Sequence, residues 1–359
     1  MRTNFFFKID EKAEKLATEK GLKRAIWIVT NKCNLSCGFC YADSQLCHGY
    51  KLSKLTKMDE LSTDECFKAV DKFHEAGIKG IVVGGGEPML RPDLFEIAKY
   101  AKGKGMSLSI ATNGTLINED NCKDISSIFK RIELPLDGFE NTHNSLRGKT
   151  YSKICNSIDL VKNKMYTSVC TLALEENMQE LPAFLDKVIS PMEINEYRLM
   201  RLTMLGRGKS EDYPGYVRKY LETDYKLIDR FKNISKGKIV IEDAPLIYNK
   251  ALWSDSRVEF QPCAPGLNAI TVLPDGYLTL CPVLEKTGIR AGHILKDDIH
   301  EAFYKSEIFE QARNRTECDG CGFYKNPCYG GCVCATVAGG KKVNQRDPSC
   351  PGPDYYELL

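Results

Sequence analysis

The chain has 359 residues, 43% of them hydrophobic, which is enough for two domains and a sizeable apolar core. Lys and Arg number 50 and Asp and Glu 48, so the net charge of +2 offers no broad basic field to nucleic acid. No secretory signal opens the chain, and no apolar run approaches the roughly 18 residues of a membrane span. We therefore expect a cytoplasmic protein that binds neither nucleic acid nor membrane.

Short apolar and β-branched runs alternate with helical patterns over the first two thirds of the chain. The predicted strands are 25–30, 79–85, 107–112, 131–136, 167–174 and 196–202. The predicted helices are 63–76, 93–102, 118–130, 153–162 and 179–189. This order predicts an α/β fold with a parallel sheet and right-handed crossovers. Six units are too few for a closed eight-stranded barrel, so we predict a partial (β/α)6 barrel with ligands at the carboxyl ends of its strands.

The alternation ends near residue 240. There the run KIVIED and a hairpin with Pro274-Asp275-Gly276 at its turn lead into a helical stretch and a cysteine-rich end. We predict an N-terminal extension over residues 1–21, the partial barrel over 22–240 and a second domain over 241–359.

Sixteen cysteines are unusual in a chain without a secretory signal, because clustered thiols in a reducing compartment are more often metal ligands or catalysts than disulfides. Three form the pattern C-x3-C-x2-C at Cys33, Cys37 and Cys40. Three thiolates so close together can hold one side of a [4Fe–4S] cluster and leave the fourth iron open to a small molecule. A structural zinc site is the alternative, although such a site takes four protein ligands.

Three further strands are followed by turn-like motifs at the same predicted mouth. These are Gly85-Gly86-Glu87-Pro88, then Asn113-Gly114, then Asp137-Gly138 with His143 and Arg147 beyond it. The first motif lacks the GK[ST] of a phosphate-binding loop. Each motif alone is also compatible with a simple turn, but beside the three cysteines they favour a ligand site.

The C-x3-C-x2-C pattern with its aromatic neighbour, together with GGEP after the second strand, resembles the radical S-adenosylmethionine (SAM) superfamily. In that family the open iron binds the methionine end of SAM, and one electron cleaves SAM to methionine and a 5′-deoxyadenosyl radical that abstracts a substrate hydrogen. The resemblance implies that the cluster is held by Cys33, Cys37 and Cys40. It also implies that Phe39 lies near the adenine, and that the methionine amino group is lined by Gly85, Gly86, Glu87 and Pro88.

The chain departs from the family pattern at one position. Many relatives have a serine two residues before the aspartate of the fourth strand, where it helps to hold SAM, and this chain has Pro135. Asn113 or the pair Arg198 and Arg201 could compensate, and strand alternation favours Arg201 within that pair.

The C-terminal cysteines form a second constellation: Cys263, Gly276-x4-Cys281, Cys318-x2-Cys321-x6-Cys328-x3-Cys332 and Cys350. The layout resembles the SPASM domain, which binds auxiliary iron–sulfur clusters. The family usually has five residues between the second and third cysteines of this run, whereas this chain has six between Cys321 and Cys328. A zinc knuckle is the alternative. The resemblance implies one cluster on Cys318, Cys321, Cys328 and Cys350, and another on Cys263, Cys281 and Cys332. The second set lacks a fourth thiolate, which leaves either Cys334 or an open iron that binds substrate.

The resemblance implies an oxidoreductase or maturase with three [4Fe–4S] clusters, one that binds SAM and two auxiliary, and a low-potential electron donor of the ferredoxin or flavodoxin type. The heme-modifying and cofactor-maturing branch is favoured, so we expect a peptide, protein or tetrapyrrole-like cofactor precursor as substrate. The competing hypothesis is a non-enzymatic iron–sulfur electron carrier or regulator, which would have no use for GGEP or an open iron. The sequence does not identify the residue that completes the reaction.

Overall fold

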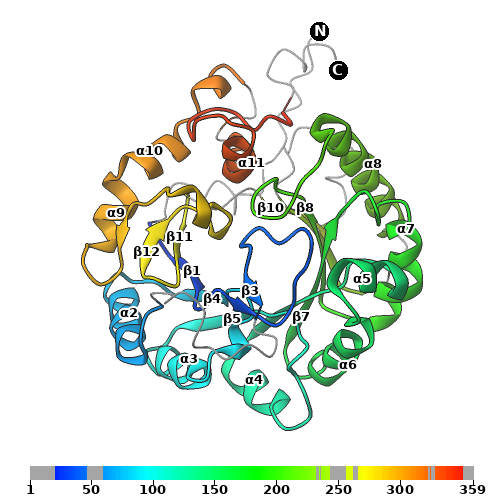
Figure 1. The fold of residues 1–359 in the computed structure, drawn as a ribbon, viewed down its shortest axis with the longest axis horizontal. Coiled ribbons are helices and arrows are strands. Elements are labelled where there is room, and N and C mark those ends of the chain that lie inside the picture. The colour runs from blue at the N-terminus through cyan, green and yellow to red at the C-terminus, as the bar shows by residue number, and fades with distance from the viewer. Residues whose placement is uncertain are drawn as a thin grey trace.

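The computed structural model describes residues 21–46, 60–231, 234, 236–242, 256–261, 266–321, 324 and 328–350. The described strands form an eleven-stranded sheet in the order β10-β9-β8-β7-β6-β5-β4-β1-β11-β12-β13 and a small sheet of β2 and β3. In Figure 1 helices surround the large sheet, and the loop that follows β1 lies within the ring of strands.

The strands of the large sheet are β1 (Arg24–Ile28), β4 (Gly80–Gly84), β5 (Ser107–Ala111), β6 (Arg131–Pro135), β7 (Tyr166–Ala173), β8 (Glu196–Arg201), β9 (Lys238–Glu242), β10 (Val258–Gln261), β11 (Ala269–Val272), β12 (Tyr277–Thr279) and β13 (Gly292–His293). The small sheet pairs β2 (Lys32–Cys33) with β3 (Gln45–Leu46). The helices are α2 (Thr63–Glu75), α3 (Leu94–Gly103), α4 (Cys122–Ile128), α5 (Glu140–Arg147), α6 (Tyr151–Val161), α7 (Leu181–Phe184), α8 (Tyr213–Phe231), α9 (Ile299–Lys305), α10 (Glu307–Arg313) and α11 (Val333–Ala338).

All six predicted strands are present, as β1 and β4 to β8, and they pair in parallel. The predicted helices correspond to α2, α3, α4, α6 and α7, and the last of these continues as a π-helical turn over Leu185–Ile189. The sheet has two ends, β10 and β13, and does not close on itself. The predicted partial barrel is therefore confirmed.

Helix α2 illustrates how the local sequence produces the fold. Ser62 and Glu65 form a capping box that satisfies backbone N–H groups at the start of the helix. The helix buries Cys66, Ala69, Val70 and Phe73, and the Phe73 ring meets Trp27 of β1 edge to face with ring centroids 5.4 Å apart. This packing anchors β1 on its outer face, immediately before the loop that carries the first cysteines.

The sheet continues beyond the six strands that the sequence predicts. Strands β9 and β10 extend it in parallel from β8, and β11 pairs in parallel with β1 on the opposite side from β4. The predicted hairpin is present, since β11 and β12 pair antiparallel. The boundary at residue 240 remains a prediction. Strand β9 contains this residue, and strands from both sides of it pair in one sheet, as β9 does with β8 and β11 does with β1.

Within the described part of the barrel segment, two helices were missed by sequence analysis. Helix α5 is largely polar and buries only His143, so it lacks the apolar stripe from which a helix is predicted. Helix α8 begins with Tyr213-Pro214-Gly215, which resembles a turn, although proline is well tolerated in the first turn of a helix. None of the helices in the described part of the chain has the length and apolar character that a membrane span needs.

The pairing of β11 with β1 predicts that the barrel segment does not fold as a separate unit. A fragment of residues 1–240 would leave the backbone edge of β1 without its partner, and exposed edges favour aggregation. We expect this fragment to be insoluble or to lack a cooperative urea unfolding transition, whereas the full chain shows one. A soluble fragment that unfolds cooperatively and is monomeric by light scattering would contradict this expectation.

Candidate functional site

The loop that follows β1, residues 29–46, carries three cysteines and is called here the first-cysteine loop. Its two ends meet where β2 pairs with β3. Cys33 and Cys37 are buried and Cys40 is half-buried, and none of the described cysteines forms a disulfide. Figure 1 shows this loop inside the ring of strands, as expected for a ligand site at the carboxyl end of β1.

Arg207, in the loop after β8, holds the first-cysteine loop from the opposite side of the barrel. Its backbone N–H donates to the carbonyl oxygen of Cys40 at 2.9 Å, and its Nε donates to the carbonyl oxygen of Cys37 at 2.9 Å. Its Nη1 also pairs with Asp43 Oδ1 at 2.7 Å. The neighbouring Gly206 lies so close that an added Cβ would be 2.3 Å from the Tyr41 carbonyl oxygen. The loop is therefore positioned by contacts to its own backbone.

The two glycines of the GGEP turn also pack against the first-cysteine loop. Gly86 N–H donates to the Thr30 carbonyl oxygen at 2.8 Å, and Glu87 N–H donates to the Lys32 carbonyl oxygen at 2.8 Å. A Cβ on Gly85 would lie 2.5 Å from the Thr30 oxygen, and one on Gly86 would lie 2.3 Å from the Lys32 oxygen. Only glycine fits this close approach.

Glu87 is fully buried and its carboxylate is used within the protein. It accepts hydrogen bonds from the Thr112 hydroxyl at 2.7 Å, the Asn113 N–H at 2.7 Å and the Met89 N–H at 3.0 Å. Burial raises its pKa, while these three donors act in the opposite direction. Glu87 thus ties the end of β4 to the end of β5, and Pro88 begins a short 3-10 turn directly after it.

Asn113 brings the end of β5 to the first cysteine. Its Nδ2 donates to Asn34 Oδ1 at 2.7 Å and lies 4.0 Å from Cys33 Sγ. Its Oδ1 accepts from the backbone N–H of Thr115 at 2.9 Å. The structure therefore gathers Cys33, the GGEP turn and Asn113 at one end of the sheet, as the parallel arrangement predicts.

The turn after β6 is held by a buried histidine. The Nδ1 of His143 accepts the Asp137 N–H at 3.1 Å, and its Nε2 lies 3.1 Å from the Thr150 hydroxyl. Burial lowers the pKa of His143 to about 4, so the ring is neutral near pH 7. His143 positions the Asp137 backbone rather than supplying charge.

Arg147, at the end of α5, connects this turn to the first-cysteine loop. Its guanidinium forms an ion pair with the fully buried Asp137 carboxylate, and its central carbon lies 4.9 Å from the centre of the Phe39 ring. Arg147 also lowers the pKa of the Cys37 thiol, against the larger effect of burial, which raises it. A fixed positive charge thus lies beside both a cysteine and the aromatic residue expected near the adenine.

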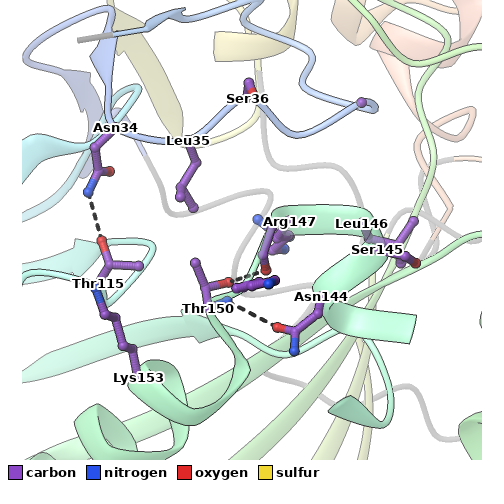
Figure 2. Close-up of a pocket in the computed structure, with 13 residues that line it drawn as sticks. Asn34, Leu35, Ser36, Thr115, Asn144, Ser145, Leu146, Arg147, Thr150 and Lys153 are labelled. Carbon is purple, nitrogen blue, oxygen red and sulfur yellow. Dashed lines mark hydrogen bonds between the residues drawn. The ribbon is translucent and has the colours of Figure 1, made fainter. Parts of the chain in front are cut away.

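A pocket of about 520 Å³ adjoins these groups, within the usual size range of small-molecule sites. Figure 2 shows it between the first-cysteine loop and the region of α5 and α6, with Asn34 donating to Thr115 across one side. Its lining is Asn34, Leu35, Ser36, Gly38, Thr115, Asn144, Ser145, Leu146, Arg147, Gly148, Lys149, Thr150 and Lys153. This lining includes three cationic residues and no acidic one.

Comparisons with known proteins identify the family. The sequence profile of the radical SAM superfamily matches residues 27–188, which contain the first-cysteine loop and the ends of β4 to β6. Residues 27–188 form a radical SAM domain. It is therefore an enzyme, and the alternative of a non-enzymatic electron carrier is set aside. A [4Fe–4S] cluster and SAM are the cofactors that the radical SAM assignment implies.

Relatives of known activity span almost the whole chain. Mycofactocin maturase MftC of Mycolicibacterium smegmatis is 26% identical over 347 residues, which cover 92% of this chain and 84% of that protein. AdoMet-dependent heme synthase of Methanosarcina barkeri is 25% identical over 353 residues, which cover 90% of this chain and 95% of that protein. The chain is thus similar to radical SAM enzymes of the maturase and heme-synthase group.

Solved structures support the radical SAM fold over nearly its whole length. SuiB of Streptococcus suis has a TM-score of 0.70 at 15% identity, with 92% of this chain and 77% of that chain covered. Native anSMEcpe with bound AdoMet has a TM-score of 0.65 at 20% identity, with 94% of both chains covered.

The first-cysteine loop has the donor chemistry that an iron–sulfur cluster requires. Burial is the main cause that raises the pKa of the Cys33 thiol to about 11, and the nearby Cys37 and Cys40 thiols contribute to this rise, so the three sulfurs interact electrostatically. Bound iron would stabilise the thiolate forms. Among the described residues, no three Cys, His, Asp or Glu side chains converge on a single metal ion. A four-iron cluster takes each thiolate at a different iron, so it does not need such convergence.

The C-terminal cysteines are brought together as the sequence pattern suggests. Cys318, Cys321, Cys328 and Cys350 all line one small pocket, together with Glu317, Tyr324, Gly330 and Arg346. Burial is the main cause that raises the pKa of the Cys318 thiol to about 12, and the other three thiols contribute to this rise. These four sulfurs therefore form one group.

Cys332 belongs to a different group, in which the Cys334 thiol interacts with the thiols of both Cys281 and Cys332. Cys263, which the sequence pattern assigns to the same cluster, lies outside the described residues.

Arg201 connects the barrel to the C-terminal cysteines. Its Nη2 pairs with Asp347 Oδ2 at 2.6 Å, and this carboxylate oxygen also accepts the Cys332 N–H at 2.8 Å. Both side chains are almost completely buried. Arg198 instead pairs with Glu196 at 2.7 Å. A role for Arg201 in binding SAM remains a prediction, since the structure shows its guanidinium engaged by Asp347.

Sequence analysis left several residues out of its candidate site that the structure brings into it. Arg147 carried a weak signal in its spacing from Asp137-Gly138. Arg207 carried no sequence signal, because its partners are backbone carbonyl groups of residues that are distant in the sequence, such as Cys37. Asp347 was hidden in the same way, since its partner Arg201 is 146 residues away.

We expect Gly86→Ala to disrupt the first cluster. The new methyl group would overlap the Lys32 carbonyl oxygen and push the first-cysteine loop away from the GGEP turn. A displacement of about 1 Å in an active site can cost roughly 100-fold in rate, so formation of 5′-deoxyadenosine from SAM should fall by about that factor.

Gly103→Ala is the matched control, because an added Cβ there meets no atom within 4 Å. This variant should retain both the iron content and the SAM cleavage of the natural chain. Equal activities in the two variants would show that the glycine contact does not position the loop.

Proposed function

We propose that this enzyme binds a SAM-cleaving [4Fe–4S] cluster at Cys33, Cys37 and Cys40 and abstracts a hydrogen atom from a peptide, a protein or a tetrapyrrole-like cofactor precursor. The observation that supports this most is the gathering of the three thiols, the GGEP turn and Asn113 at one end of the sheet, beside a pocket of about 520 Å³. Each of these groups comes from a different strand end, so a simple turn motif does not account for the arrangement.

When bound at these cysteines, the cluster would supply the electron for reductive cleavage of SAM, and SAM would supply the group that abstracts the substrate hydrogen. The chain's own residues provide binding and orientation for this chemistry. Backbone groups of Gly85, Gly86, Glu87 and Pro88 would line the methionine amino group. Because the Glu87 carboxylate is occupied by three protein donors, we assign it to holding the turn in shape.

Phe39 and Arg147 form the other side of the proposed SAM site. The Phe39 ring offers a face for stacking, and Arg147 is held by Asp137 in a fixed orientation next to Cys37. Arg147 is therefore the best-placed described cation for a carboxylate near the first cluster. In this role Arg147 would replace the contact to SAM that many relatives make with a serine at the position of Pro135.

The pocket lining favours a ligand that carries carboxylates. Lys149 and Lys153 contribute positive charges to a lining that contains no acidic residue, and Arg147 adds a guanidinium that pairs with Asp137 outside the lining. Acidic peptides and tetrapyrrole propionates both have this character, as does the methionine end of SAM. The similarity to a mycofactocin maturase and to a heme synthase is in keeping with both substrate classes.

We further propose two auxiliary [4Fe–4S] clusters, one on Cys318, Cys321, Cys328 and Cys350 and one that includes Cys281 and Cys332. The proposal is supported by the grouping of the described thiols: four line one small pocket, and Cys281 and Cys332 lie in a separate group. Cys263 remains a predicted ligand of the second auxiliary cluster. A low-potential ferredoxin or flavodoxin would deliver the electrons.

Cys37→Ala should abolish SAM cleavage while the auxiliary clusters remain. The reason is that Cys37 lies in the first-cysteine loop, whereas the proposed auxiliary ligands begin at Cys263 in the sequence. The protein is reconstituted and reduced anaerobically with SAM, and 5′-deoxyadenosine is measured by chromatography. The buried Cys66 of α2 provides the control variant Cys66→Ala, which should cleave SAM normally. Cleavage by Cys37→Ala, or no cleavage by the natural chain, would refute the proposed function.

The proposed cluster number predicts the iron content of the reconstituted chain. Three four-iron clusters amount to about twelve irons per chain. Iron and acid-labile sulfide are measured after anaerobic desalting, and a chelator applied to the folded protein should leave most of the iron in place because most of the ligand thiols are buried. About eight irons would mean that one of the three thiol groups does not hold a cluster.

A further inference from the structure

The cysteine Cys334 belongs to none of the ligand sets that the sequence pattern assigns. Its thiol interacts with the thiols of Cys281 and Cys332, so three thiols from two separate chain segments lie near one another. Cys281 lies two residues beyond the end of the short strand β12, and Cys332 directly precedes α11. Cys334 is 1% exposed and Cys332 is 3% exposed. Cys281 is half-buried.

The local backbone explains how two cysteines only two residues apart face the same partner. In a regular helix their side chains would point about 200° apart. Cys332 is not part of the helix: it is the N-cap residue, with φ −78° and ψ 119° in the extended region, and α11 begins at Val333. The chain therefore turns between the two residues, which lets both thiols reach Cys281.

The position of Cys332 is fixed from both sides. Gly330 and Gly331 have φ values of +86° and +77°, which favour glycine, and they turn the chain toward the thiol group. Asp347 then accepts the Cys332 N–H at 2.8 Å. A Cβ on Gly331 would lie 2.4 Å from the Asp347 Cβ, so this approach depends on glycine. The thiol group is thus built by specific backbone contacts.

We propose that Cys334 is an iron ligand of the auxiliary cluster that Cys281 and Cys332 bind. The inference rests on the proposed function only in assuming that this auxiliary cluster exists. Each thiol would lose its proton as its sulfur bonds to iron. Cys334 supplies the thiolate that the sequence pattern lacks, in place of an iron left open for substrate.

Burial around Cys334 argues against an open iron at this position. A substrate-binding iron needs access from outside, as the pocket beside the first-cysteine loop provides for the SAM site. Here the neighbouring residues Val333, Ala335 and Thr336 are all buried, with Thr336 completely so. Cys334 itself occupies the space next to the two other thiols.

The test uses the full chain with Cys33, Cys37 and Cys40 changed to alanine, so that only auxiliary clusters contribute. This background should hold about eight irons per chain after anaerobic reconstitution. Adding Cys334→Ala should remove either one iron, giving a three-iron signal by electron paramagnetic resonance, or a whole cluster of about four irons. Mössbauer spectroscopy of the iron-57 protein measures the same loss. Adding Cys66→Ala, an equally buried cysteine outside the thiol groups, should change neither quantity.

A Cys334→Ser variant covers the case in which alanine prevents folding. Serine keeps the size of the side chain and replaces the sulfur ligand with oxygen, so the resonance of the reduced auxiliary cluster should shift. Iron content and spectra unchanged by both substitutions would overturn the proposal, as would a background that binds no iron. SAM cleavage is measured separately in the natural chain, so its absence would refute the proposed function without altering this result.

Discussion

The buried ion pair between Arg201 and Asp347 is the contact on which the placement of the C-terminal cysteines depends. It joins the end of β8 to a carboxylate that also accepts the N–H of Cys332 at 2.8 Å and the N–H of Ser349 at 2.8 Å. Two charges removed from water stabilise a fold only if each is well partnered, and loss of one partner typically costs about 3–5 kcal/mol. The pair therefore specifies one geometry, in which Cys332 and the segment before Cys350 are fixed relative to the barrel.

The first-cysteine loop shows the same principle with neutral groups. Its backbone carbonyls accept hydrogen bonds from Gly86 and Glu87 on one side and from Arg207 on the other. These contacts do not involve the cysteine side chains. The loop shape is thus set by the protein, which leaves the thiols available for iron and limits the reorganisation that cluster binding requires.

Local patterns were enough to predict the six strands, the GGEP turn and the grouping of the cysteines by spacing. Contacts between distant segments were not predictable in this way. Strand alternation favours Arg201 over Arg198 as a site residue, but the sequence does not single out its partner Asp347 from the many other carboxylates of the chain. Likewise, whether the thiols of Cys332 and Cys334 face the same partner depends on whether the helix begins before or after Cys332, and helix boundaries are the least reliable part of a sequence prediction.

The position of β1 in the sheet has a consequence for how the enzyme is made. Strand β1 lies between β4 and β11, with Arg24 opposite Ala269, so the strand that leads into the first-cysteine loop gains its second neighbour late in synthesis. At the usual speed of ribosomes, roughly 10 to 50 s separate the two segments. During that interval one edge of β1 has no partner, and Cys33, Cys37 and Cys40 follow it in an incomplete barrel. Delivery of iron and sulfide to the nascent chain would thus meet an unfinished binding site, which makes cluster insertion a step that follows translation.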